Sequence, residues 1–306
     1  MTVIFEHHLT FNASHNNDST TALTVLCTNL KNTEYTLSVN QIKQAISQGA
    51  LWLTRGKQTQ RLRRVKKSLL PRDKLHFYYN EAVLATKVEK ATLISDEQDY
   101  SVWYKPFGML SQGSKWSDHC TIGRYVQQHL TPERPAFVVH RLDKAATGLI
   151  LIAHSKKAAK ALSTMFEKRT TEDNLLEKYY QIIVHGNHSI IEQPQTINTI
   201  VDGKNACSTF TCLAYDKALN KSLIKVKIDS GRKHQIRIHA ASIGFPVVGD
   251  RLHGIADENE VQNLQLCAVS LSFICPFSIE QGSPLKKSFT LPNELQSDLM
   301  HKIGLE

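Results

Sequence analysis

The feature that most constrains this 306-residue chain is a pair of apolar runs joined by a short charged turn, in the stretch FVVHRLDKAATGLILIAHS. The runs at 138–139 and 149–152 are aliphatic and bounded by a turn, which predicts two buried strands. A turn that only reversed the chain would favour Asn-Gly or Asp-Gly. This turn instead carries four ionisable groups: His140, Arg141, Asp143 and Lys144. Such groups either take part in chemistry or form a solvated loop.

Downstream of Tyr100, strand-like and helical runs alternate. Residues 178–186 and 221–229 have the aliphatic content of strands, whereas 156–170 has the apolar spacing of an amphipathic helix. A further helix is expected to begin at about His234. Strands with hairpin-like returns mixed with helices favour an α+β core over a doubly wound parallel sheet.

A strongly basic segment lies between Leu51 and Lys74, with nine basic residues against one acid, Asp73. The formal net charge of the whole chain is +9 at pH 7. A solvated face would mix acids with bases, so the single sign favours phosphate binding and a polyanionic partner. The candidate RNA contacts in this segment are Arg61, Arg63, Arg64, Lys66 and Lys67.

The residues around this segment form a helix followed by a hairpin. Val39, Ile42 and Ile46 share one helical face, Gly49 ends the helix, and a short apolar run leads to a turn. With IKQAISQGALWLTRG and PRDKLHF, the unit resembles the S-four type RNA-binding domain, although that family's first helix is not recognisable upstream. The resemblance implies a small, divergent α/β RNA-binding domain at 1–80, followed by a connector at 81–98.

Three further residue types could carry chemistry. Asp143 would be held rigidly between two core strands, as a nucleophile or base must be, or it could simply cap its own turn. Arg237, among apolar neighbours, needs a carboxylate partner, which could be catalytic or structural. Tyr179 and Tyr180 face opposite ways on a strand, so one of them could present its ring to a pocket.

Metal and redox chemistry find no support in the sequence. His140, His234 and His239 lack a metal-ligand spacing, and the six cysteines include no CxxC pair. Reduced thiols and the lack of a secretory leader favour the cytoplasm. No apolar run approaches the roughly 20 residues needed to span a bilayer. We therefore expect no metal and no membrane association.

Taken together, five segments occur in the order of one family: KPFGMLSQG, HRLDKAATGLILIAHS, KYYQIIVHG, SGRKHQIRIHAASIGFPVVGD and LCAVSLSFICPF. Over roughly residues 100–280 the chain resembles the RluA-type pseudouridine synthases. The resemblance implies a catalytic domain at 99–306 with a mixed, largely antiparallel sheet flanked by helices. It also implies an RNA isomerase that uses no cofactor.

The resemblance assigns roles to individual residues. Asp143 would be the nucleophile, Arg237 would pair with it, and Tyr180 would stack on a uridine flipped out of the RNA. Arg141 would fill the space that the flipped nucleotide leaves. The remaining candidate RNA contacts are His140, Arg232 and His234. Ala146, Cys267 and Cys275 replace residues usual in the family, which bears on substrate preference.

The RNA partner is expected to be ribosomal RNA, because of the S-four-like segment, with transfer RNA left open. The resemblance favours a monomer. Two alternatives remain at this level: a non-catalytic RNA-binding protein of the same fold, and a nucleic-acid glycosylase or hydrolase. Neither explains why Asp143, Tyr180 and Arg237 occur together in their motifs.

Overall fold

The computed structural model describes residues 2–12, 20–168, 176–255, 262–280, 284–296, 300 and 303. Contacts divide the chain into two compact units. The N-terminal unit comprises Met1–Lys87 together with Gln112–Arg124, and the larger unit comprises Val88–Ser111 and Tyr125–Glu306. The domain boundaries 1–80, 81–98 and 99–306 stay a prediction. Residues 112–124 belong to the N-terminal unit by their contacts, although in the sequence they lie between two parts of the larger unit.

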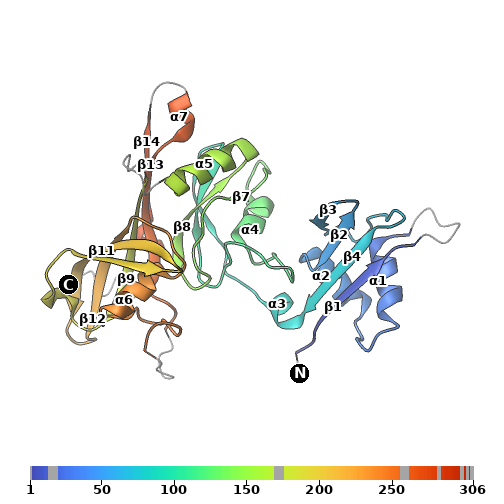
Figure 1. Cartoon of the computed structure of the whole chain (residues 1–306), viewed down its shortest axis with the longest axis horizontal. Helices are drawn as coiled ribbons and strands as arrows, with labels where there is room; N and C mark the ends of the chain where they lie inside the picture. Colours follow the sequence, from blue (N-terminus) through green and yellow to red (C-terminus); the bar gives the residue numbers. More distant parts are fainter. Residues whose placement is uncertain are drawn as a thin grey trace. The chain divides into compact units, whose positions relative to one another are not determined.

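The N-terminal unit is a four-stranded antiparallel sheet with helices packed on one face (Figure 1). Alternate residues such as Phe5, Leu53 and Phe77 point into its core. The strands in sheet order are β1 (Ile4–Thr10), β4 (Lys74–Asn80), β2 (Leu51–Arg55) and β3 (Gln58–Arg61). The helices are α1 (Ala22–Leu30), α2 (Val39–Ser47) and α3 (Glu81–Ala85).

Helix α2 lies where the sequence predicts it, and its start is fixed by a capping box between Ser38 and Gln41. Helix α1 was not expected from the sequence. It buries Ala22, Val25 and Leu26 at helical spacing, but its β-branched residues have weak helix propensity. Packing against the sheet therefore outweighs local preference in α1.

The larger unit is built on one mixed sheet (Figure 1). Its main path, in sheet order, is β10 (Gln195–Val201), β11 (Lys204–Asp216), β12 (Lys221–Ile228), β9 (Leu176–His185), β13 (Leu266–Ile274), β8 (Thr147–Ala153), β6 (Tyr100–Lys105) and β5 (Thr92–Asp96). Two strands lie off this path, β14 (Lys286–Thr290) on β13 and β7 (Phe137–Val138) on β8. Among the described strands the β13–β8 pair is parallel and the others are antiparallel, so the predicted mixed, largely antiparallel sheet is confirmed.

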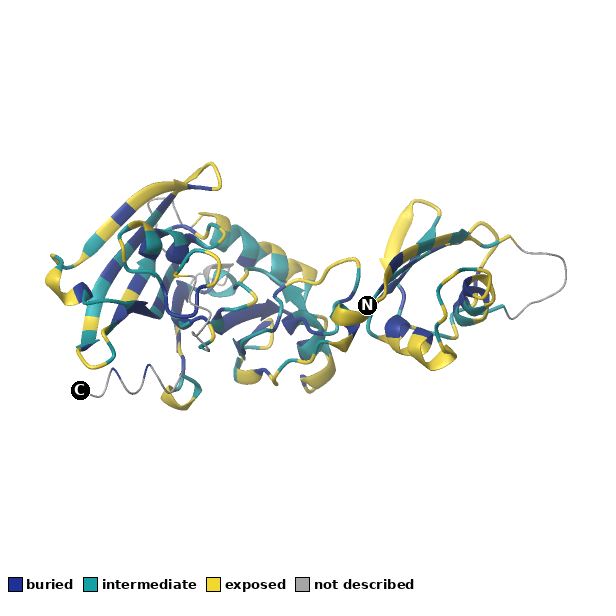
Figure 2. Ribbon diagram, turned by 90° about the horizontal axis from the view of Figure 1, so that it is seen from below, coloured by how far each residue is buried: buried dark blue, intermediate teal, exposed yellow. Residues whose placement is uncertain are grey.

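Helices and short turns complete the larger unit: α4 (Ile122–His129, which begins in the N-terminal unit), α5 (Lys156–Lys168), α6 (Gln235–Ser242), α7 (Pro276–Glu280) and two 3-10 turns (His188–Ile190 and Asn293–Leu295). Strand β8 is buried along nearly its whole length, whereas β10 at the sheet edge is largely exposed (Figure 2). Within the described ranges, no helix is long and apolar enough to cross a membrane.

The turn that carries Asp143 is longer than a hairpin turn. Val138 pairs with Ile152, and the chain then leaves the sheet until Thr147. The prediction of two buried strands is right for β8 but wrong for β7, which has two half-buried residues. The shortness of β7 frees the residues around Asp143 to form a loop instead of a tight turn.

Gly148 allows the parallel pairing of β8 with β13. Its φ of +108° suits glycine alone, and a methyl group there would overlap the backbone of Ala268, its partner on β13. We predict that Gly148→Ala lowers the free energy of unfolding by about 3 kcal/mol or more, through backbone strain and overpacking together. Urea unfolding of the whole chain measures this.

Gly203 is the matched control, because it has a φ of +70° and open space around its α-carbon. Gly203→Ala should cost only about 1–2 kcal/mol, from the left-handed backbone alone. Equal losses for the two variants would contradict the role assigned to the β8–β13 contact.

Candidate active site

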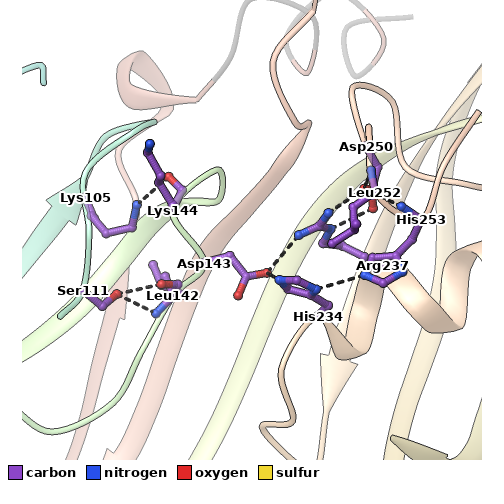
Figure 3. A network of polar contacts seen from close by, with 10 residues as sticks. All are labelled: Lys105, Ser111, Leu142, Asp143, Lys144, His234, Arg237, Asp250, Leu252 and His253. Carbon is purple, nitrogen blue, oxygen red and sulfur yellow. Dashed lines mark hydrogen bonds and ion pairs between the residues drawn. The ribbon is translucent and has the colours of Figure 1, made fainter. Parts of the chain in front are cut away.

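The loop that carries Asp143 is held on both sides of that residue (Figure 3). On one side, Ser111 Oγ donates to the carbonyl of Leu142 at 2.7 Å and accepts from its N–H at 3.0 Å. On the other, Lys105 Nζ donates to the carbonyl of Lys144 at 3.5 Å. Its remaining donors reach the carbonyls of Pro106 and Met109 at 3.1 and 2.9 Å. The carboxylate of Asp143 is thus presented from a fixed backbone.

Arg237 connects Asp143 to a second carboxylate. Its Nε and Nη2 donate to the two oxygens of Asp250 at 2.7 and 2.6 Å, and its Nη1 lies 3.5 Å from Oδ2 of Asp143. Burial alone would raise the pKa of Asp250, but hydrogen bonds from Arg237 and from two backbone N–H groups outweigh it and hold that pKa below its ordinary value. The sequence predicted one carboxylate partner for Arg237, and the structure has two.

His234 approaches Asp143 from the start of α6. Its backbone is left-handed, with φ 54° and ψ 20°, which costs a non-glycine residue about 1 kcal/mol or more. Its Nε2 lies 3.8 Å from Oδ2 of Asp143, and its Nδ1 lies 2.9 Å from Nε2 of His253. Burial lowers the pKa of His234, although the carboxylate of Asp143 acts in the opposite direction.

An open pocket is lined by Asp143, Arg237 and His234, together with Tyr180, Arg141 and Arg232. Its apolar wall contains Leu142, Ala146, Ile228 and Leu266. Six of the residues predicted for the site therefore meet in one place: Asp143, Tyr180, Arg237, Arg141, Arg232 and His234.

The sheet register sets the position of Tyr180. Tyr180 pairs with Ala268 of β13, and Ala268 pairs in turn with Gly148 of β8. Tyr180 lines the pocket, whereas Tyr179 packs against the hydrophobic core, so the two rings are divided as a strand requires. Lys178 Nζ lies 5.4 Å from the centre of the Tyr180 ring.

His140 ties the loop to β8. Its Nε2 accepts a hydrogen bond from the backbone N–H of Leu151 at 3.0 Å, and its ring lies 4.3 Å from that of Phe166. These contacts give His140 a part in holding the loop. Its contact with RNA stays a prediction.

The five basic candidates of the N-terminal unit are not equivalent. Arg61 and Arg63 both pair with Asp118, and the Arg61 side chain is only 12% exposed. Arg64, Lys66 and Lys67 instead line an open hollow of the N-terminal unit. Backbone N–H groups at the start of α1 donate to the carbonyls of Val65 and Lys67, which fixes this basic loop. Arg64, Lys66 and Lys67 are thus the three candidates that line this hollow, and RNA contact by all five stays a prediction.

Sequence reasoning assigned no role to Lys105, Ser111 or Asp250, although all three lie in the quoted segments KPFGMLSQG and GFPVVGD. A usable signal was present for Asp250, because a buried arginine needs a carboxylate near it. In the described part of the chain, no three His, Cys, Asp or Glu side chains converge as metal ligands would.

Burial lowers the pKa of Lys105 from 10.5 to about 7, with Asp143 acting in the opposite direction. Between pH 7 and 10.5 the folded state then holds fewer protons than the unfolded state, so stability rises with pH across this window. The free energy of unfolding of the wild type relative to Lys105→Met should increase by about 4 kcal/mol from pH 7 to pH 10. Chemical denaturation at each pH measures it.

Lys144→Met, which removes the charge of an exposed neighbouring lysine, is the control. If the difference in the free energy of unfolding between the wild type and Lys105→Met does not change with pH, the three carbonyl acceptors keep Lys105 charged in the folded state.

The chain is similar to known proteins of one family. A family model described as RNA pseudouridylate synthase matches residues 99–242. An uncharacterized RNA pseudouridine synthase of Aquifex aeolicus is 30% identical over 232 residues, which cover 65% of this chain and 72% of the relative. Ribosomal large subunit pseudouridine synthase D of Zymomonas mobilis is 25% identical over 231 residues, which cover 67% and 70%.

Among solved structures, human RNA pseudouridylate synthase domain containing 1 has the same fold, with a TM-score of 0.54 at 21% identity. The match covers 68% of this chain and 85% of the human chain. The S-four resemblance of the N-terminal residues stays a prediction. From its relatives and its family match, the chain belongs to the RNA pseudouridine synthases and is an isomerase.

Proposed function

We propose that this enzyme isomerises specific uridines of ribosomal RNA, with Asp143 as the nucleophile. The observation that carries the assignment is the position of the Asp143 carboxylate, which lies in the pocket within reach of Arg237 and His234 on a loop held from both sides. Ribosomal RNA is supported by the relative named ribosomal large subunit pseudouridine synthase D. The basic loop supports an RNA partner of either kind. A cytoplasmic location, supported by the free cysteines, and a monomeric state, which the family resemblance favours, belong to the proposal.

Pseudouridine formation breaks the bond from ribose to N1 of uracil and rejoins the base through C5. Asp143 would attack either the sugar or the pyrimidine ring. Arg237, fixed by its bidentate pair with Asp250, would orient the carboxylate through Nη1. A fixed donor of this kind loses little entropy when the reaction begins.

The target uridine must leave its stack to reach the pocket. Tyr180 offers a ring on which the flipped base could stack, a contact worth roughly 1–3 kcal/mol. Arg141 is exposed at the pocket and could enter the space left in the RNA. The apolar wall would exclude water that could otherwise trap the sugar.

We predict that Asp143→Asn abolishes isomerisation while RNA binding is retained, because the amide keeps the shape of the side chain but is a poor nucleophile. Pseudouridines are mapped by carbodiimide labelling and primer-extension stops in ribosomal and transfer RNA from cells with and without the gene. One or a few stops in ribosomal RNA should disappear without the gene and return with the wild type alone.

Turnover by Asp143→Asn would contradict the assignment of Asp143 as the nucleophile. If the stops that disappear without the gene lie only in transfer RNA, transfer RNA replaces ribosomal RNA as the substrate and the proposed chemistry stands.

The basic loop should contribute affinity without sequence information. We predict that changing Arg64, Lys66 and Lys67 to Gln weakens RNA binding and reduces the slope of log K against log salt by about 2–3 if each contacts a phosphate. Filter binding at several salt concentrations measures this. The matched control removes three exposed lysines of α5, Lys156, Lys157 and Lys160. Equal loss of slope in both triple variants would show a net-charge effect instead of a specific surface.

A further inference from the structure

His234 and His253 form a hydrogen-bonded pair to which the proposed function gives no part in proton transfer. His234 lines the pocket, with Nε2 3.8 Å from Oδ2 of Asp143. Its Nδ1 lies 2.9 Å from Nε2 of His253, so one of these two nitrogens donates to the other. His253 is partly exposed, and its backbone N–H donates to Asp250 at 3.0 Å. A chain of groups therefore leads from the catalytic carboxylate toward solvent (Figure 3).

The backbone of His234 supports a functional role for this arrangement. His234 occupies the N-cap position of α6 in a left-handed conformation, yet its side chain makes no capping hydrogen bond. A residue that served the helix would instead be an extended Ser, Thr, Asp or Asn. The strained conformation places the imidazole between Asp143 and His253.

We propose that His234 is the base that removes the proton from C5 of the rejoined uracil, and that His253 passes this proton toward solvent. The inference rests on the proposed function, because it assumes that Asp143 has released the sugar before this step. The Asp143 carboxylate then stabilises the imidazolium that forms 3.8 Å away. General-base catalysis of this kind contributes typically 10²–10⁴-fold to a rate.

The step conserves atoms and electrons. After C5 has bonded to the sugar, C5 still carries its hydrogen, and a double bond joins N1 to C6. Nε2 of His234 takes the proton, and the C5–H electron pair forms the C5–C6 double bond. The former N1–C6 pair returns to N1, which takes up a proton from water. In the tautomer that this requires, Nδ1–H of His234 donates to Nε2 of His253.

The experiment uses the full-length enzyme and unmodified ribosomal RNA transcribed with uridine that carries hydrogen, deuterium or tritium at C5. Tritium release measures turnover, and the ratio of rates for hydrogen and deuterium measures how far C5 deprotonation limits it. His234→Asn is the main variant, because asparagine adopts the left-handed backbone more readily than most residues. His253→Asn tests the second member of the pair, and Lys233→Gln, an exposed neighbour, is the control.

We expect His234→Asn to lower turnover on the order of 10²-fold or more and to raise the C5 isotope effect above that of the wild type. His253→Asn should raise the isotope effect with a smaller loss of turnover. Lys233→Gln should leave the isotope effect unchanged. A merely structural role would lower turnover without changing the isotope effect.

Retained turnover in His234→Asn, or lost turnover with an unchanged isotope effect, would overturn the inference and leave the proposed function in place. No tritium release by the wild type from ribosomal RNA would overturn the proposed substrate and this inference together.

Discussion

The site depends on one buried cation. Arg237 has a side chain only 8% exposed, and its guanidinium cannot lose its proton under ordinary conditions, so it must be neutralised where it lies. Asp250 provides the bidentate partner, and Asp143 lies on the remaining side. Removing one member of such a buried pair typically costs about 3–5 kcal/mol, because the other charge is left unpaired. The arginine that contacts Asp143 therefore also holds the segment after α6 against the helix.

Much of this could be predicted from the residues alone. The aliphatic runs predicted β8, β9 and β12, and the helix expected at about His234 begins at Gln235. The candidate residues Asp143, Tyr180 and Arg237 share a pocket, as their motifs implied. These features depend on local periodicity and on segments that keep their order, so a single sequence carries them.

The remainder depends on contacts between distant residues. The pairing of Arg61 and Arg63 with Asp118 joins positions more than 50 residues apart, and it gives two of the predicted RNA contacts an acidic partner within the unit. No local pattern gives the left-handed backbone of His234 or the clamp of Ser111 on Leu142. Helix α1 forms in spite of its composition, because the sheet offers its apolar face a partner.

The grouping of Gln112–Arg124 with the N-terminal residues limits how the two units could have been joined or separated in evolution. The chain passes from one unit to the other after Lys87, after Ser111 and after Arg124. The two units are therefore joined by three chain crossings and not by a single linker. Within that unit, Trp52 Nε1 donates to the carbonyl of Lys115, and Ser117 Oγ donates to that of Gln48. A shortened chain that begins at residue 88 would lose these partners close in sequence to Ser111, which holds the loop of Asp143. Gain or loss of the N-terminal unit in evolution would thus require matching changes within residues 112–124.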